Sequence, residues 1–242
     1  MSHILITGGT GTLGRALSAV LSQSGILHTV ASRSNRANIS NWVACDLMKN
    51  TGVAEAVAGK NIIFHLASDL KNDELITRNL VQAIGMEGNV HLIYMSIVGI
   101  DKVPFAYYKK KLAAEQVIKE SGVPYTKMRA TQFHEFVHQI ISTFLAGPIG
   151  FLPKNIVSQP IELKVVAQEL LRLSRLQPTG ITYEIGGKEA MTLHQMARIW
   201  TLQSGKRRLI LNLPIWGELG RTFANGGLTT PNVSQQSATW LQ

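Results

Sequence analysis

Short apolar runs alternate with amphipathic segments through the first 130 residues of the chain. The runs are rich in β-branched and aliphatic residues, as in buried parallel strands, and they lie at 4–6, 27–31, 42–44, 62–66, 90–95 and 125–128. Apolar residues at helical spacing predict helices at 12–24, 74–84 and 107–121. Strands that alternate with helices predict parallel strands joined by right-handed crossovers, and therefore an α/β fold with a Rossmann-type doubly wound parallel sheet.

The alternation loosens beyond residue 145. The segment Gly147-Pro148-Ile149-Gly150 interrupts it, and only two further helices are predicted, at 165–176 and 193–203. We therefore expect residues 1–145 to form the sheet core. Residues 146–242 are expected to form a small C-terminal lobe that lines the substrate site and belongs to the same folding unit.

Composition narrows the function classes. Apolar residues make up 45% and charged residues 16% of the chain, which is typical of a soluble globular protein. No apolar run is long enough for a membrane helix, the start does not resemble a signal peptide, and the single cysteine is Cys45. We therefore expect a cytoplasmic protein. The net charge of +9 is scattered, so no nucleic-acid partner is expected, and the histidine spacings predict no metal site.

A glycine-rich segment, residues 7–14 (TGGTGTLG), joins the first strand to the first helix. Gly9, Gly11 and Gly14 fit the pattern G-x-G-x-x-G, and Gly8, Gly11 and Gly14 fit G-x-x-G-x-x-G. Such glycines allow a tight turn, a close approach of the pyrophosphate to the backbone, and close packing of helix on strand. Because the segment lies between a strand and an amphipathic helix, it predicts a dinucleotide site at the helix N-terminus.

The residues after the second strand indicate which dinucleotide. An NAD site usually has an acidic residue about 20 positions after the glycines to hold the ribose 2′-hydroxyl. No acidic residue precedes Asp46, and the second strand instead leads into Ser32-Arg33, with Arg36 nearby. A guanidinium pairs with phosphate in a forked geometry. We therefore predict that NADP(H) is preferred over NAD(H).

Tyr107 and Lys111 have the spacing Y-x-x-x-K in the helix predicted at 107–121. Residues four apart share one helical face, so both can reach one site. Reduction of a carbonyl by hydride requires a proton donor at the developing alkoxide, and an ammonium beside a phenol favours loss of that proton. The pair is therefore a candidate for catalysis, with Tyr107 as acid and Lys111 positioning it.

Several motifs together resemble the short-chain dehydrogenase/reductase superfamily, and above all its atypical NmrA-like NAD(P)-binding branch. They are the glycine segment, the spacing Tyr107-x-x-x-Lys111-x-x-x-Glu115, the segment 121–136 (SGVPYTKMRATQFHEF) and YEIGG at 183–187. The resemblance extends over essentially the whole chain.

The resemblance also implies contacts for individual residues. Gly8, Thr10, Gly11, Thr12 and Leu13 would contact the pyrophosphate, Ser32 and Arg33 the adenosine ribose, and Asp46 and Leu47 the adenine. Leu66, Ala67 and Ser68 would line the cofactor. Lys111 would contact the nicotinamide ribose, and Ala130 and Thr131 would lie near the nicotinamide. Phe133 and His134 would face the substrate, although His134 can equally be a surface histidine. Enzymes of this family that reduce carbonyls have a serine after the fifth strand. Two interpretations of Ser96 stay open. It is that catalytic serine, or it is a strand-end serine that only bonds backbone, in which case the usual catalytic place falls on Ile97 or Val98.

Two function classes remain open at this level. One is an NADPH-dependent oxidoreductase that transfers hydride to a small carbonyl or quinone-like acceptor, with Tyr107, Lys111 and Ser96 as catalytic residues. The other is a non-catalytic NADP(H)-binding redox sensor that reports to a protein partner. The paired Tyr107 and Lys111 favour the enzyme, and the departure from the family pattern at the serine favours the sensor. A nucleotide-sugar epimerase is disfavoured because the substrate lobe is short.

Overall fold

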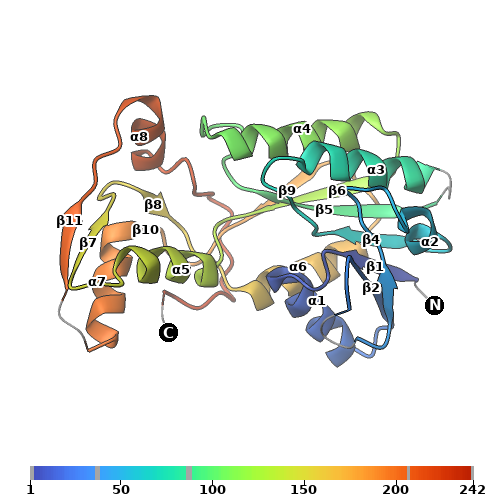
Figure 1. The fold of residues 1–242 in the computed structure, drawn as a ribbon, viewed down its shortest axis with the longest axis horizontal. Helices are drawn as coiled ribbons and strands as arrows, with labels where there is room; N and C mark the ends of the chain where they lie inside the picture. The colour runs from blue at the N-terminus through green and yellow to red at the C-terminus, as the bar shows by residue number, and fades with distance from the viewer. Residues whose placement is uncertain (1–2, 36–38, 86–88, 206–207, 241–242) are drawn as a thin grey trace. The chain divides into compact units, whose positions relative to one another are not determined.

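The computed structural model describes residues 3–35, 39–85, 89–205 and 208–240 (Figure 1). Arg36, one of the predicted cofactor residues, lies outside these ranges. The chain divides into two compact units. The first consists of Met1–Ser96, Lys109–Arg129 and Val166–Tyr183, and the second of Ile97–Tyr108, Ala130–Val165 and Glu184–Gln242. The chain therefore passes between the units several times, whereas the sequence-based prediction divided it once, at residue 145.

The main sheet has seven strands in the order β3-β2-β1-β4-β5-β6-β9. Their bounds are β1 Ile4–Thr7, β2 His28–Ser32, β3 Trp42–Ala44, β4 Ile62–His65, β5 His91–Ile97, β6 Tyr125–Ala130 and β9 Thr182–Ile185. The pairs of β1 with β2 and β4 are parallel, and Ile4 lies opposite His28 on one side and Ile62 on the other. The predicted Rossmann-type doubly wound sheet is confirmed.

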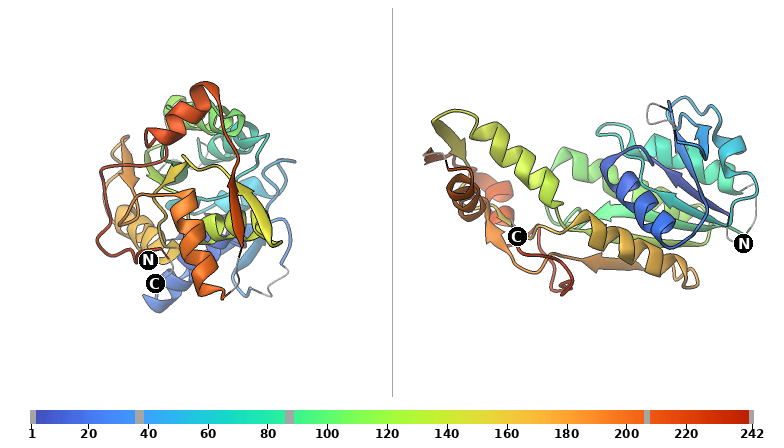
Figure 2. Two further views of the ribbon diagram at one scale, coloured as in Figure 1. Left: turned by 90° about the vertical axis from the view of Figure 1, so that its left-hand side faces the viewer. Right: turned by 90° about the horizontal axis from the view of Figure 1, so that it is seen from below.

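Helices cover both faces of the sheet in the first unit. Their bounds are α1 Thr12–Gln23, α2 Val53–Val57, α3 Asp73–Gly85, α4 Ala106–Glu120 and α6 Leu163–Ser174. Figure 1 shows α3 and α4 over one face and α1 and α6 over the other, and the view from below in Figure 2 has α1 and α6 in front of the strands. This two-sided cover explains why the central strands read as continuous apolar runs.

The periodicity of α1 shows how the sequence determines this packing. Leu13, Leu17 and Leu21 lie on one stripe and are all buried. The helix ends at Gly25, whose φ of +66° is a left-handed conformation that glycine adopts without strain. The N–H of Ile26 donates to the Leu21 carbonyl at 2.9 Å and closes the last turn. The boundary predicted from Gly25 therefore agrees with the structure.

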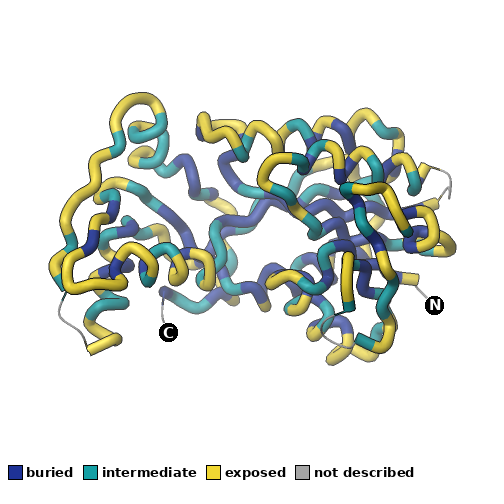
Figure 3. The backbone as a smooth tube through the Cα atoms, viewed as in Figure 1, coloured by how far each residue is buried: buried dark blue, intermediate teal, exposed yellow. Residues whose placement is uncertain are grey.

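The second unit contains smaller elements. They are β7 Ile149–Leu152, β8 Val157–Ser158, β10 Met191–Thr192, β11 Leu209–Asn212, α5 His134–Phe144, α7 Leu193–Gln203 and α8 Gly217–Ala224. β7 pairs with β11 in parallel, and β8 with β10 in antiparallel register. Val137, Ile141, Leu152, Met196 and Trp240 lie in one apolar cluster. Figure 3 shows how much more exposed backbone these elements have than the strands of the main sheet.

Several elements were missed by the sequence pattern. They include α5, which buries only Val137 and Ile141, and β9, whose four residues are all only half-buried. Among the described residues, no helix combines the length and apolarity needed to cross a bilayer.

Candidate cofactor site

The glycine segment forms a turn that only residues without a side chain can make. Gly8 has a φ of +67°, and a Cβ there would lie 2.6 Å from the backbone N of Ala67. A Cβ on Gly9 would lie 2.6 Å from Val30 Cγ1, and one on Gly14 would lie 2.5 Å from the Cα of Gly9. The space that side chains would fill is therefore occupied by backbone at Gly8 and Gly14 and by the Val30 side chain at Gly9. This loop fits the close approach of a dinucleotide pyrophosphate.

The loop opens directly into α1. The Gly11 N–H donates to the Gly8 carbonyl at 2.9 Å, and the Arg15 N–H donates to the Gly11 carbonyl at 3.0 Å. Gly11 is the N-cap and no side chain caps the helix, and the first turn contains no acidic residue. The first backbone N–H groups of α1 therefore keep their capacity to donate to an anion, and the helix dipole adds positive potential there.

The end of β2 and the loop after it contain the predicted ribose contacts Ser32 and Arg33. Ser32 Oγ accepts from Trp42 Nε1 at 2.8 Å and donates to the Ser34 carbonyl at 2.9 Å. Arg33 is exposed. Backbone N–H groups, that of Lys71 first, lower the pKa of Asp69, and the charge of Arg33 adds to this effect. The loops that follow β2 and β4 are therefore close enough for Arg33 and Asp69 to interact.

Asp46 and Leu47 form a turn beyond β3. The Asp46 carboxylate accepts from the N–H groups of Met48 and Lys49 at 3.0 and 3.1 Å. Leu47 is buried, and its carbonyl accepts from Asn79 Nδ2 at 2.7 Å. Both predicted adenine contacts thus lie on a turn whose backbone is fixed by hydrogen bonds.

The segment after β4, Leu66 to Ser68, leads to a buried carboxylate at the start of α3. Asp73 is 1% exposed, and its Oδ1 accepts from the Asp69 N–H at 2.7 Å. Ser68 Oγ donates to Asp73 Oδ2 at 3.2 Å. Lys111 Nζ, from α4, lies 3.4 Å from the same Oδ2. Two predicted cofactor residues, Ser68 and Lys111, therefore share one acidic partner.

Lys111 is surrounded by groups of the first unit. Its Nζ lies 4.7 Å from the centre of the Tyr94 ring, and its side chain is 5% exposed. Burial lowers the pKa of Lys111, while the charges of Asp73 and Glu115 act in the opposite direction. The ammonium is therefore maintained by its acidic neighbours, because a buried unpaired amine would lose its proton more readily.

His65 and two threonines form a hydrogen-bonded row of uncharged side chains near Lys111. The ring nitrogens of His65 contact Thr7 Oγ1 at 2.8 Å and Thr77 Oγ1 at 3.1 Å. Burial, with the charge of Lys111 adding to it, lowers the pKa of His65 to about 3. His65 is therefore a packed, uncharged residue at neutral pH, as expected for a histidine within a strand.

Ser96 belongs to a different network. Its Oγ donates to Glu115 Oε1 at 2.6 Å, and both residues are buried. Arg129 holds the same carboxylate with two bonds, at 2.9 Å from Nε and 3.0 Å from Nη2, and Lys127 Nζ lies 3.2 Å from Oε2. The hydroxyl of Ser96 therefore serves a buried ion cluster here, and its catalytic role stays a prediction.

Tyr107 and Tyr108 lie at the start of α4. Tyr107 is half-buried, and its ring centre is 6.2 Å from that of Tyr108. Burial raises the pKa of Tyr108 to about 12, although a hydrogen bond with Gln132 opposes this. A phenol with so high a pKa is a poor acid at neutral pH, which disfavours Tyr108 as the proton donor.

The residues after β6 belong to the second unit. Thr131 Oγ1 donates to the Gln159 carbonyl at 2.5 Å. Phe133 is the N-cap of α5, and the His134 ring meets Trp240 edge-on with centres 5.6 Å apart. Within the described residues, the buried Nε2 of His134 has no hydrogen-bond partner. Ala130 is buried at the end of β6.

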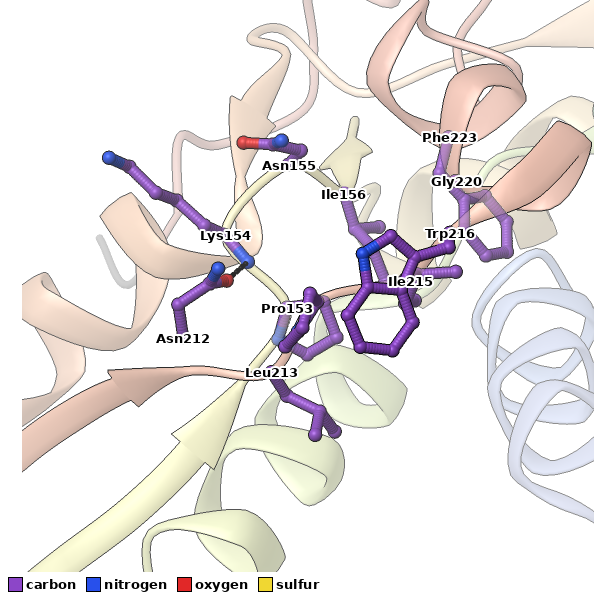
Figure 4. A pocket seen from close by; sticks show the side chains of 11 residues that line it. Pro153, Lys154, Asn155, Ile156, Asn212, Leu213, Ile215, Trp216, Gly220 and Phe223 are labelled. Carbon is purple, nitrogen blue, oxygen red and sulfur yellow. Dashed lines mark hydrogen bonds between the residues drawn. The ribbon is translucent and has the colours of Figure 1, made fainter.

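The second unit also has a hollow of about 190 Å³ (Figure 4). Its walls are the segment 153–156, the segment that follows β11, and α8, and they include Ile156, Trp216 and Phe223. The Lys154 N–H donates to Asn212 Oδ1 at 2.9 Å at one side of it. None of the predicted site residues lines this hollow. The described part of the chain brings no three His, Cys, Asp or Glu residues together in a way that could hold a metal.

The first unit therefore contains most of the predicted cofactor residues. The glycine segment, the ends of β2 and β4, and Lys111 lie there; Ala130, Thr131, Phe133, His134 and Tyr107 belong to the second unit. Sequence reasoning missed Asp73, because an acidic residue in the first turn of a helix is ordinary. The spacing of Lys111 and Glu115, four residues apart, was a usable signal that Glu115 shares the inward face of α4.

Fold and loop together define a dinucleotide-binding α/β protein of the Rossmann type. The sequence model of the NAD(P)H-binding family matches residues 8–139, more than half of the chain. The chain belongs to this family, and it binds NAD(P)H.

Individual relatives are more distant. Quinone oxidoreductase 2 of Escherichia coli (strain K12) is 24% identical over 221 residues, which cover 87% of this chain and 77% of that protein. A crystal structure of NADPH-dependent quinone oxidoreductase from Escherichia coli complexed with NADPH has a TM-score of 0.80 at 21% identity, covering 94% of this chain and 91% of the other. A nucleoside-diphosphate-sugar epimerase from Staphylococcus aureus also reaches 0.80, at 18% identity, over 95% and 92% of the two chains. At these identities the structures establish a shared fold.

Proposed function

We propose that the protein is an NADPH-dependent oxidoreductase that transfers hydride to a small carbonyl or quinone-like acceptor. The observation that carries the proposal is the glycine turn, whose side-chain space is filled by backbone at Gly8 and Gly14, followed by the uncapped start of α1. Bound there, the reduced nicotinamide supplies the hydride. The chain's own residues hold the phosphates, orient the ribose through Lys111, and deliver a proton from Tyr107.

Within this class we favour a quinone-like acceptor over a simple aldehyde or ketone. The Ser96 hydroxyl donates to Glu115 at 2.6 Å, so it is engaged and does not point its proton at a substrate carbonyl. A simple carbonyl needs strong acid assistance because its alkoxide is very basic. A quinone gives an aromatic, much less basic oxyanion, and needs less assistance. The distant Escherichia coli relative named quinone oxidoreductase 2 is consistent with this choice.

A panel of acceptors tests the proposal. NADPH oxidation would be followed with soluble quinones, aldehydes and ketones, and we expect kcat/KM for the best quinone to exceed that for the best aldehyde by at least about tenfold. Oxidation of NADPH without acceptor is subtracted as the background. If NADPH binds at micromolar concentrations and no acceptor is turned over, the reductase proposal fails. The rival proposal, a redox sensor, which the engaged Ser96 also supports, then becomes the better one.

The preference for NADPH is a second part of the proposal, and Arg33 carries it. Arg33 is exposed after β2, where an NAD-binding protein has its acidic residue. Replacing Arg33 by alanine removes a charge-assisted hydrogen bond to the 2′-phosphate, worth about 1.5–3 kcal/mol. We therefore expect Kd for NADPH to rise about 10- to 100-fold and Kd for NADH to change by less than about twofold. Titration of cofactor fluorescence measures both.

Arg175→Ala is the matched control, because it removes an equally exposed guanidinium just beyond α6. It should leave both dissociation constants near their wild-type values. Wild-type protein that binds NADH more tightly than NADPH, or an Arg33→Ala variant that loses both cofactors equally, would contradict the assignment of Arg33.

A further inference from the structure

The carboxylate of Asp73 is one of the most buried charges of the first unit. It is 1% exposed, and a carboxylate so deeply buried is strongly destabilising unless it is paired and hydrogen-bonded. Its two oxygens receive the Asp69 N–H at 2.7 Å, Ser68 Oγ at 3.2 Å and Lys111 Nζ at 3.4 Å. One side chain thus joins the loop after β4 to helix α4.

The loop on one side of Asp73 is rigidly built. The Asp69 carboxylate accepts from the N–H groups of Lys71 and Asn72 at 3.0 and 2.9 Å, and from Asn72 Nδ2 at 2.9 Å. The same residue gives its own N–H to Asp73. The backbone from Ser68 to the start of α3 is therefore held at both ends, and any change at Asp73 is transmitted to Ser68.

The groups that face the Lys111 ammonium come from four elements. Asp73 contacts it from α3, the Tyr94 ring lies beneath it from β5, neutral His65 of β4 feels its charge, and Glu115 lies one turn away on α4. Glu115 is already bound by Arg129 and Lys127. Asp73 is therefore the carboxylate that directly offsets the burial of Lys111.

We propose that Asp73 is the positioning residue of the cofactor site, which acts by fixing Ser68 and by keeping the Lys111 ammonium charged and directed at the bound cofactor. The inference rests on the proposed function only in taking Ser68 and Lys111 as cofactor contacts. Asp73 acts through these two residues and touches neither cofactor nor substrate. Neutralising it makes the charge on Lys111 dependent on pH.

The test is the pH dependence of NADPH binding to Asp73→Asn. Without its acidic neighbour, buried Lys111 has a pKa lowered further, so the ammonium is lost as pH rises. At each pH we take the ratio of the variant's Kd for NADPH to the wild-type Kd. We expect this ratio to be below about 3 at pH 6 and to rise about tenfold by pH 9. Binding is followed by cofactor fluorescence, so no turnover is needed.

Three variants separate positioning from a purely structural role. In a Lys111→Met background, the second substitution Asp73→Asn should have no pH-dependent effect on binding. The double variant carries no buried unpaired charge, so it remains measurable even if Asp73→Asn alone fails to fold. Asp73→Glu keeps the charge and should restore a flat pH dependence. Glu74→Gln removes the next, exposed acid in the first turn of α3 and should behave as the wild type.

The outcomes are distinct. A Kd ratio that is constant with pH, or an equal loss in the Lys111→Met background, overturns the inference. If wild-type protein turns over quinones while Asp73→Asn binds NADPH normally at every pH, the inference fails and the proposed function stands. If no acceptor is reduced but NADPH binding shows the predicted pH dependence, the proposed function fails and the role of Asp73 stands.

Discussion

Replacing Gly14 by alanine is expected to weaken NADPH binding about 100-fold or more. The new Cβ would lie 2.5 Å from the Cα of Gly9, where only backbone atoms could give way. The loop must therefore move, and the N–H groups that we propose bind phosphate lose their positions; each such charge-assisted bond is worth about 1.5–3 kcal/mol. Overpacking also lowers the free energy of unfolding by about 1–3 kcal/mol. Cofactor titration and urea unfolding measure the two effects.

Gly85→Ala is a close control, because Gly85 is also a helical glycine but its Cβ would meet nothing within 4 Å. Its free energy of unfolding and its Kd should both remain near wild type, the former within about 0.5 kcal/mol. Wild-type affinity in Gly14→Ala would show that the pyrophosphate is held elsewhere.

Glu115→Gln is expected to lower the free energy of unfolding by about 3–5 kcal/mol at pH 7, because it leaves buried Arg129 and partly buried Lys127 without their counter-charge. Glu115 joins α4 to β5 and β6 through Ser96, Lys127 and Arg129, at 2.6 to 3.2 Å. Removing one partner of a buried ion cluster leaves uncompensated charge, so it destabilises the fold more than replacing the whole cluster by apolar residues would. Chemical unfolding of both proteins provides the comparison.

The effect has a defined pH dependence. Burial acts to raise the pKa of Glu115, but hydrogen bonds from Arg129 and Ser96 and the charges of Arg129 and Lys127 outweigh it, so the pKa is lowered. A lowered folded pKa contributes stability above the unfolded value, about 4.3, and loses it as pH falls through the folded pKa. The difference between wild type and Glu115→Gln should therefore shrink below about pH 4.

Glu120→Gln tests the same chemistry at an exposed position of the same helix, where Glu120 accepts from Gln116 Nε2. It should change stability by less than about 0.5 kcal/mol. A loss below about 1 kcal/mol for Glu115→Gln, or one that is independent of pH, would mean that the cluster contributes little net stability.

The fold could be predicted where each strand and helix carries its own pattern. β1, β4 and β5 are buried on both faces and therefore read as apolar runs, and α1 has a buried stripe ended by Gly25. All four residues of β9 are only half-buried, so this strand carries no continuous apolar run. The glycine turn was predictable because Gly8 and Gly14 meet constraints that arise within a single strand-turn-helix segment.

The candidate site could be predicted only in part, because its remaining features depend on long-range contacts. Asp73 and Lys111 are 38 positions apart, and no local pattern pairs them. The partner of Ser96 is likewise on another element, so the sequence could not show that its hydroxyl serves Glu115. Sequence spacing gives the residues of one helix face, while the charge environment of each residue depends on neighbouring elements.

The interleaving of the two units limits how the protein can be divided. Segment Val166–Tyr183 belongs to the first unit, and β9 lies beside β6 through bonds such as Gly180 N–H to the Tyr125 carbonyl and Lys127 N–H to the Ile181 carbonyl. A fragment that stops before residue 166 would leave β6 as an open edge, which invites pairing between molecules. Exchanging the second unit with that of a relative, to change the acceptor, would therefore require several splice points instead of one.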